Sequence, residues 1–456
     1  MFNKLVFIAS LGLILSCSKE DEPAIPEGID EEFVGEIDLI KTIGGSQQDD
    51  FLSVVATTDG GVAAFGFTQS NDGDVIIGKP STDSDYWLVK FDQDLNIQWQ
   101  KIFGGSDDDR GQSIIQTDDG GFAVTGFSKS DDGDITGNFG FQDYWVVKLN
   151  ASGGIQWEKS IGFSGNDRGY DIIQTQDGGY FATGFLDVTA SEGEGNDEFD
   201  SLKTSSNSKG AKHGVGEYWG IKLNAGGDIQ WRRYFGGTNN DRSYAAIQTQ
   251  DGGYIQTGHS ESDDFDVENP IGSYDIWVVK TFADGVLDWE KSFGGSGIEI
   301  AFDVIETEDN NFMLVGDTRS SDRDVSNPRG NSDIWIIKFD VEGNLIWEKT
   351  YGGPEFESGR SIIAIGNNDY FITSSSRSST DQVETNYGSN DVWGVIIDGN
   401  GDIKWQKTIG GSGLDFGNDA AINSSKEIFV VGNTASNDTD FPTNKGDNDA
   451  FIIKLK

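Results

Sequence analysis

The acidic side chains of this chain offer the most chemistry, because they recur at fixed positions. The 456 residues include 77 Asp and Glu against 33 Lys and Arg, a formal net charge of −44. With two His and one Cys, the composition argues against Cys/His zinc sites, Cys nucleophiles and most His-based acid–base catalysis. The charge argues against nucleic acid and anionic membranes as partners, since phosphate contacts need Lys and Arg. The carboxylates remain, and they suit a cation, a cationic ligand or glycoside hydrolysis.

Each of seven repeats opens with a glycine, and an acidic residue stands five positions after that glycine. The glycines are Gly44, Gly104, Gly162, Gly236, Gly294, Gly352 and Gly410, and the acids are Asp49, Asp109, Asp167, Asp241, Glu299, Glu357 and Asp415. Each acid precedes the first strand of its repeat, so the seven are predicted to ring a central channel, where they could bind a cation or a cationic ligand. The alternative is structural, with each carboxylate accepting N–H groups of its own loop or pairing with an arginine such as Arg110. Recurrence in every repeat favours the structural alternative.

A second acidic pattern lies in a longer loop of each repeat. Spaced carboxylates in a flexible loop can coordinate Ca²⁺, although none here matches an EF-hand loop. The candidate ligands are Asp72, Asp74 and Asp85; Asp132, Asp134 and Asp143; and Asp264, Asp266 and Asp275. The alternative is a solvated loop held by Asx turns. We expect no required cofactor, and Ca²⁺ is the one ion that the pattern allows.

The repeats predict four short β-strands each, which we call strands A to D in chain order. Tight Asp-Gly-Gly and Asn/Asp-x-x-Gly turns separate the runs, as in an antiparallel meander. In the second repeat, strand C (144–147) is apolar on both faces and must be covered on both, whereas strand D (155–159) alternates and is half exposed. The twelve Trp form pairs twelve residues apart, and we expect Trp145 to lie opposite Trp157 across the C–D turn.

The two ends of the chain distinguish a closed ring from an open solenoid. The seventh repeat stops after strand C, at Lys456, while residues 36–43 match the missing strand D position for position, with Leu39 at the Trp405 site. An N-terminal strand that completes the last repeat removes the exposed sheet edge. The sequence therefore predicts an all-β fold over residues 36–456, a seven-bladed β-propeller of four-stranded antiparallel blades.

The last repeat resembles a known bacterial family. Residues 428–436, 440–442 and 449–454 are similar to the SBBP-type seven-bladed β-propeller repeat. The resemblance covers about 36–456 and implies the same fold. It implies almost nothing about function, because these repeats occur in many uncharacterised secreted proteins.

The N-terminus predicts a processing signal. Residues 1–16 combine Lys4 with an apolar run of about eleven residues, too short to span a bilayer. The segment before Cys17 resembles a bacterial lipobox, which implies cleavage before Cys17 and its lipidation. Residues 17–35 then form an acidic tether, similar to surface-export tags of some Gram-negative lipoproteins. We expect a lipid-anchored outer-membrane protein exposed at the cell surface, with the periplasmic face as the alternative.

Loop lengths indicate which face carries function. In a four-stranded meander the B–C and D–A loops share one face, and here the B–C loops are long and acidic. The third repeat has about sixteen extra residues within 187–216, also in a B–C loop. We expect a monomeric binding or scaffold module for a protein or glycan partner on this face. The alternatives are a carbohydrate-active or other enzyme that uses carboxylates of the acidic face, and a purely structural surface protein.

Overall fold

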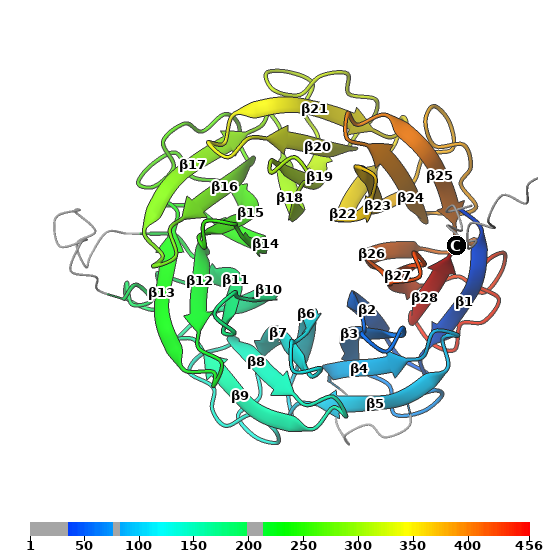
Figure 1. The fold of residues 1–456 in the computed structure, drawn as a ribbon, viewed down its shortest axis with the longest axis horizontal. Helices are drawn as coiled ribbons and strands as arrows, with labels where there is room; N and C mark the ends of the chain where they lie inside the picture. Colours follow the sequence, from blue (N-terminus) through cyan, green and yellow to red (C-terminus); the bar gives the residue numbers. More distant parts are fainter. Residues whose placement is uncertain (1–34, 76–82, 198–212) are drawn as a thin grey trace, which may run out of the picture. The chain divides into compact units, whose positions relative to one another are not determined.

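The computed structural model describes residues 35–75, 83–197 and 213–456. Within them every regular element is a β-strand, and seven four-stranded antiparallel sheets stand around a centre (Figure 1). Blade one consists of β2 (Asp49–Ala56), β3 (Val62–Thr68), β4 (Asp85–Phe91) and β5 (Ile97–Phe103), ordered from the centre outward. The predicted seven-bladed propeller is confirmed.

The other blades repeat this order from strand A to strand D. Blade two is β6 (Asp109–Gln116), β7 (Phe122–Ser128), β8 (Asp143–Leu149) and β9 (Ile155–Ile161); blade three is β10 (Arg168–Gln174), β11 (Tyr180–Leu186), β12 (Glu217–Leu223) and β13 (Ile229–Phe235); blade four is β14 (Asp241–Gln248), β15 (Tyr254–Ser260), β16 (Asp275–Thr281) and β17 (Leu287–Phe293). Blade five is β18 (Glu299–Glu306), β19 (Phe312–Thr318), β20 (Asp333–Phe339) and β21 (Leu345–Tyr351); blade six is β22 (Glu357–Gly366), β23 (Asp369–Ser376), β24 (Asp391–Asp398) and β25 (Ile403–Ile409); blade seven is β26 (Asp415–Ile422), β27 (Ile428–Thr434), β28 (Asp449–Leu455) and β1 (Ile37–Ile43).

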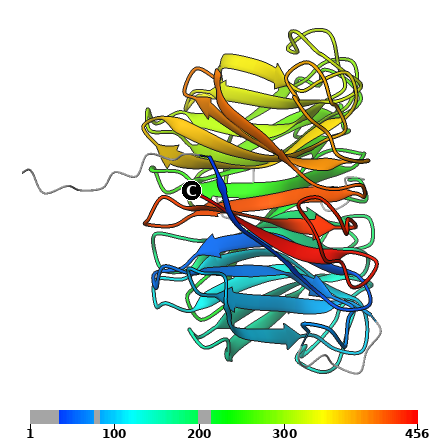
Figure 2. The ribbon, with the colours of Figure 1, turned by 90° about the vertical axis from the view of Figure 1, so that its right-hand side faces the viewer.

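The N-terminal strand closes the ring. β1 pairs antiparallel with β28, with Leu39 opposite Lys454, just as Trp99 lies opposite Lys90 in blade one. Figures 1 and 2 show β1 at the outer edge of blade seven, beside the C-terminal strand. The prediction that the two ends of the chain share one blade is therefore confirmed, and β1 covers the edge of β28.

The core lies between neighbouring blades. Every residue of β8 is buried, whereas β9 is exposed or half-buried except at Ile161. Trp145 is fully buried and Tyr86 of the preceding blade packs against it, with ring centroids 4.5 Å apart. Each strand-C tryptophan supplies a large apolar area, and burying such a side chain contributes roughly 2–3 kcal/mol.

The expected pairing of Trp145 with Trp157 is wrong. Trp145 lies opposite Ser160, and Trp157 lies opposite Lys148. The turn sits later in the chain than the spacing suggested, because the Asn150 side chain accepts the N–H groups of Ser152 and Gly154 and closes an Asx turn there. Trp157 instead packs against Tyr180 of the next blade at 5.6 Å, so the two tryptophans of a blade serve different interfaces.

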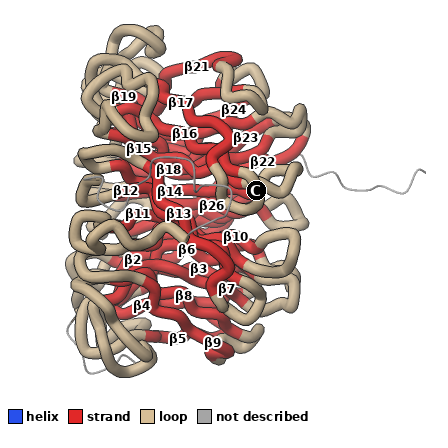
Figure 3. Tube along the Cα trace, turned by 90° about the vertical axis from the view of Figure 1, so that its left-hand side faces the viewer, coloured by secondary structure: helices blue, strands red, loops and turns tan. Residues whose placement is uncertain are grey.

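The loops gather at the two faces of the ring, as Figure 3 shows. Isolated bridges join the end of a B–C loop to the following D–A loop, for example Gln142 to Asn166. The B–C and D–A loops therefore share one face, as predicted, and we call it the B–C/D–A face. The A–B and C–D turns lie at the other ends of the same strands.

Candidate binding surface

The seven acids that precede the inner strands are buried within their own blades. All are at most 1% exposed. Asp109 accepts hydrogen bonds from Gly105 N and Ser130 Oγ, both at 2.8 Å, and Asp241 accepts the equivalent pair from Gly237 N and Ser262 Oγ. Asp167 instead accepts the N–H groups of Phe163 and Asp187. These are the hydrogen bonds expected if the acids have a structural role, because each carboxylate connects a D–A loop to its own blade.

A second buried acid, at the start of strand C, faces each of these carboxylates across the repeat glycine. A Cβ on Gly162 would overlap the Asp143 carboxylate and lie 3.0 Å from Asp167 Oδ2, and five further repeat glycines are enclosed in the same way. Burial raises the pKa of Asp143 to about 6 and that of Asp167 to about 7, and the Asp143 charge adds to the rise at Asp167. Only glycine fits between these acids, which join blade two to blade three.

Eight of the nine carboxylates considered for Ca²⁺ accept hydrogen bonds from backbone N–H groups. In blade two, Asp132 Oδ1 accepts Ser106 N at 2.8 Å, Asp134 Oδ2 accepts Gly104 N at 3.2 Å and Asp143 Oδ2 accepts Phe139 N at 2.5 Å. Asp72, Asp74, Asp264, Asp266 and Asp275 make the matching contacts in blades one and four, and Asp85 lies against Gly104. Within the described ranges, no three His, Cys, Asp or Glu side chains are grouped as a metal site. None of the three loops therefore brings its three carboxylates together as a metal site.

The apex of the B–C loop differs between blades although its backbone does not. A turn from Asp132 to Ile135 places Gly133 at φ 70°. The equivalent positions hold Phe265, Arg323, Asp381 and Thr439, all at φ between 52° and 71°. An ordinary side chain in this left-handed region costs about 1 kcal/mol or more relative to glycine. Blades four to seven therefore carry apex side chains that the fold itself does not require.

Exposed aromatic side chains also lie in the B–C loops of blades two, four and six. Phe139, Phe141 and Tyr387 of the B–C loops are 63%, 61% and 46% exposed, and the apex residue Phe265 is 51% exposed. The sequence analysis did not single out these residues. The signal was available, since aromatic residues are unusual in acidic loops that need no core packing.

The ends of the blade-three insertion are anchored to neighbouring elements. Asn196 Oδ1 accepts Tyr234 N at 2.7 Å, and Asp197 pairs with Arg232 at 2.9 Å, so the outgoing end runs along β13. At the other end, His213 is buried and its ring stacks on Phe265 of blade four, with centroids 4.8 Å apart. Residues 198–212 lie outside the described residues.

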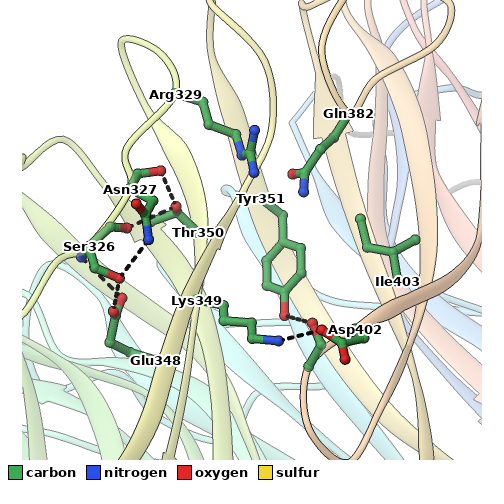
Figure 4. Close-up of a pocket in the computed structure, with 11 residues that line it drawn as sticks. Ser326, Asn327, Arg329, Glu348, Lys349, Thr350, Tyr351, Gln382, Asp402 and Ile403 are labelled. Carbon is green, nitrogen blue, oxygen red and sulfur yellow. Dashed lines mark hydrogen bonds and ion pairs between the residues drawn. The ribbon is translucent and has the colours of Figure 1, made fainter.

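A cavity of about 430 Å³ lies between blades five and six (Figure 4). Its charged groups are already paired: Lys349 with Asp402 at 2.7 Å, and Arg329 with Asp381 at 2.9 Å. The Tyr351 hydroxyl donates to Gly401 O at 2.7 Å. These contacts cross from one blade to the next, so this cavity is best explained as the seam that joins them.

A smaller cavity of about 140 Å³ occupies the centre of the ring. It is lined by two adjacent residues of each strand A, the third and fourth of β10 and the fourth and fifth of the other six. Asp171, Asp303 and Asp419 lie there beside Ser53, Ser113, Ala245 and Ser361. Asp419 accepts hydrogen bonds from Ser53 Oγ at 3.0 Å and Ser361 Oγ at 2.8 Å, one from each neighbouring blade. Burial raises the pKa of Asp303 to about 8 and that of Asp419 to about 6. The channel acids are therefore not the seven that the sequence analysis selected.

Cys17, the signal 1–16 and most of the tether 17–35 lie outside the described residues. Among the residues that are described, no helix is long and apolar enough to cross a membrane.

The solved structures that match the chain are remote from it. No family model and no curated protein matches the chain. A Bacteroides caccae protein of unknown function is 10% identical over 71% of this chain and 89% of its own, with a TM-score of 0.40. A DUF4221 member from Bacteroides vulgatus is 10% identical over 93% and 97%, with a TM-score of 0.36. YCF48 bound to D1 peptide is 9% identical over 93% and 97%, with a TM-score of 0.45.

Proposed function

We propose that this propeller is a non-catalytic binding or scaffold module that holds a protein or glycan partner on its B–C/D–A face. The observation that carries the proposal is the set of apex side chains in left-handed backbone, accompanied by exposed aromatic rings. Strain at a loop apex lowers stability, so a side chain kept there needs another explanation, and contact with a partner supplies one.

The chemistry of the face supports recognition. Aromatic side chains dominate binding energies because they offer large rigid contact areas. The insertion makes blade three different from the others. His213 at its end stacks on Phe265 of blade four, so the two blades form one continuous surface there. Partner recognition needs such differences between blades, which a perfectly repeated ring lacks.

The same observations weaken the enzyme alternative. Carboxylates of the B–C loops accept N–H groups of the neighbouring D–A loop, as Asp132 and Asp134 do. A glycosidase needs two carboxylates aimed at one substrate bond. The acids that do share a cavity, Asp171, Asp303 and Asp419, are held by serines or backbone N–H groups of neighbouring blades.

We also propose that Cys17 carries a lipid that anchors the module to the outer membrane, with the B–C/D–A face available at the cell surface. The lipobox resemblance and the acidic tether support this location. Labelling cells with an alkyne fatty acid should mark the protein, and Cys17→Ser should abolish the label. Protease treatment of intact cells distinguishes the two locations, because a protein on the periplasmic face would not be digested.

Affinity capture tests the binding function. The full-length protein, tagged at its C-terminus, is recovered from detergent-solubilised envelope beside a variant with Phe139, Phe141, Phe265 and Tyr387 changed to Ser. The control variant carries Phe282→Ser and Val341→Ser, two C–D turn residues on the other face that are 49% and 51% exposed. A stoichiometric partner should be lost from the first variant and kept by the control. Equal recovery with both variants would contradict the proposal.

A further inference from the structure

Two aspartates in the wall of the central cavity are held by both neighbouring blades in the same way. Asp171 of blade three accepts Ser113 Oγ of blade two at 2.8 Å and Ala246 N of blade four at 3.0 Å. Asp419 of blade seven accepts Ser361 Oγ of blade six at 2.8 Å and a backbone N–H group of blade one at 2.9 Å. The pattern is a serine hydroxyl from the preceding blade and a backbone N–H group from the following blade.

Asp303 of blade five breaks this pattern. It accepts Ile362 N of the following blade and Val304 N of its own strand, both at 2.8 Å. The residue of the preceding blade that should supply the hydroxyl is Ala245, which is buried in the cavity wall. Among the residues that the structure describes, no side chain donates a hydrogen bond to Asp303. One donor is therefore missing from the wall, at Ala245.

The cavity acids also lack a cation. Within residues 35–75, 83–197 and 213–456, no Lys or Arg nitrogen lies within the 4.0 Å ion-pair distance of Asp171, Asp303 or Asp419. Burial raises the pKa of Asp303 to about 8, and the charges of Asp419 and Asp171 add to the rise. Buried charges are normally paired, and a narrow cavity lined by charges of one sign attracts the opposite charge. The missing group is therefore better supplied by a cationic donor than by a neutral one.

Aromatic side chains surround the missing donor. In blade four and the blade on each side of it, the wall residue just before the channel position is aromatic and half-buried; these residues are Tyr170, Tyr244 and Phe302. Their ring centroids follow one another at 5.0 and 5.5 Å. The other four blades carry Leu52, Gln112, Arg360 and Asn418 at this position. Aromatic faces attract cations, and here they are confined to the side of the cavity where the donor is missing.

We propose that the central cavity binds a primary alkylammonium group. The ammonium nitrogen lies beside Ala245, donates to Asp303 and takes the place of the absent serine hydroxyl. An ammonium group has three N–H donors and no acceptor, so it suits a wall of carboxylates. Tyr244 and Phe302 contact the charge and the first carbons of the chain. The cavity measures about 140 Å³, and a cavity of roughly 150 Å³ accommodates a molecule as large as benzene.

This proposal is independent of partner docking on the loop apices, because the cavity is lined by the inner strands alone. The sequence analysis expected a cationic ligand at the acids of the D–A loops. The structure buries those acids within the blades, and the acids that line the channel are different residues.

One cation already borders the cavity. The Arg360 guanidinium of blade six lies over the Phe302 ring at 4.0 Å. Burial raises the pKa of Asp317 to about 6, and the charge of Arg360 opposes that rise. Arg360 thus acts on an acid outside the cavity wall, and it stands two blades from Ala245. Its charge still opposes a second cation, so Arg360→Gln should tighten binding of the amine severalfold.

Calorimetric titration of the full-length chain at pH 8 tests the site, with n-butylammonium as the probe and n-butanol as a matched neutral control. We expect butylammonium to bind at least ten times more tightly than butanol, and more tightly than tetramethylammonium, which has no N–H donor. Ala245→Ser supplies the missing hydroxyl and should weaken binding about tenfold, as should Asp303→Asn. Ala246→Ser changes the adjacent buried alanine, which is outside the wall, and should leave binding unchanged.

The affinity should also rise between pH 6 and 8.5, because Asp303 must lose its proton before it can accept the ammonium group. The charged and titratable side chains that share the wall with it are Asp171, Asp419, Tyr170, Tyr244 and Arg360. Burial raises the pKa of Asp419 to about 6 and that of Tyr244 to about 12. Loss of protons from the aspartates in this window therefore favours the cation.

Other outcomes would overturn the proposal. Equal affinity for butylammonium and butanol would remove the role of the charge, and equal affinity for tetramethylammonium would remove the hydrogen bond to Asp303. Unchanged binding by Ala245→Ser would place the ligand elsewhere, and no binding of butylammonium at about 10 mM would reject the site. Melting curves confirm that each variant folds, and Tyr244→Leu, which should also weaken binding, replaces a variant that does not. A short peptide with one internal lysine distinguishes the sources of the amine: tighter binding than butylammonium indicates a protein side chain, and weaker binding a free amine.

Discussion

The D–A loop acids and the channel residues occupy the same inner strands, only three or four residues apart, yet they follow opposite rules. The first position of β6 is Asp109, and an acid recurs there in all seven blades, fully buried. Three residues later stands Gln112, a position that holds six different residue types in the seven blades and faces the central cavity. The comparison teaches that repetition marks the residues that hold the frame.

The physical reason is that each blade has the same unpaired backbone N–H groups at the same place. Every D–A loop has N–H groups to satisfy at a buried position, and a carboxylate satisfies them at low cost in every blade. A ligand, in contrast, meets the channel once, from one direction. The residues that contact it have no reason to repeat, so the blade-specific positions are where function is to be sought.

Removing the closing strand should have the largest effect on the frame. A chain that starts at residue 46 lacks β1, exposes β28 and loses the burial of Ile43 and the packing of Leu39. We expect its unfolding free energy to fall by at least about 5 kcal/mol, since buried aliphatic side chains contribute roughly 1.5–3 kcal/mol each. Thermal denaturation compares it with a chain that starts at residue 34. Equal melting temperatures would mean that the ring does not depend on closure.

A substitution pair within β6 tests the comparison directly. Asp109→Ala leaves Gly105 N and the Ser128 and Ser130 hydroxyls without their shared acceptor. We expect a loss of about 3 kcal/mol, because each buried group left unpaired costs roughly 1–3 kcal/mol. Gln112→Ala should cost less than about 0.5 kcal/mol, as expected for a residue without such partners. Denaturant titration measures both, and similar losses would erase the distinction between frame and channel.

The buried acid pairs should make the frame more stable at mildly acidic pH. Because the folded-state pKa values of Asp143 and Asp167 are raised to about 6 and 7 from the ordinary 3.8, the folded chain binds more protons than the unfolded chain over this window. The resulting stabilisation is fully present below about pH 4 and is lost as the pH rises through 6 to 7.

The measurement is a series of melting curves from pH 4.5 to 8. The melting temperature should be higher at pH 5 than at pH 8, and Asp143→Asn should flatten the profile. Asp119 and Asp177, whose pKa values are lowered to about 2 by side-chain and backbone hydrogen bonds, including those from Lys148 and Lys222, lose stabilisation only as the pH falls below 4. A melting temperature that rises from pH 5 to pH 8 would contradict this interpretation of the pairs.

The loop apices should show the smallest effect on stability, with the opposite sign. Arg323→Gly and Thr439→Gly relieve left-handed backbone at φ 59° and 55°. We expect each to raise the unfolding free energy by up to about 1 kcal/mol, while partner capture weakens. Gly133→Ala, the reverse change in blade two, should lower it by more, because a Cβ there would lie 2.3 Å from the Gly104 carbonyl oxygen. If the glycine variants captured more partner than the parent protein, the apex side chains would not be contact residues.

The sequence alone predicted the frame because the frame is local and repeated. The spacing of the glycines, the turn signals and the match of residues 36–43 to strand D were enough to predict seven blades and their closure. The Trp pairing was wrong because the spacing of two residues does not determine where a turn begins, whereas the Asn150 side chain does. The roles of the buried acids stayed open for a similar reason, since sequence cannot show which oxygen meets which N–H group.

The channel could not be found in the same way. Its wall is assembled from one or two residues of every blade, and Tyr170, Tyr244, Phe302 and Arg360 span about 190 residues of chain. Nothing in any one repeat identifies them, because each looks like an ordinary variation at a single position. The repeat by itself determined the blades, since a strand follows from its local pattern and its turns. Only the closed ring decided which variations meet, because closure brings the inner strands of all seven blades around one cavity.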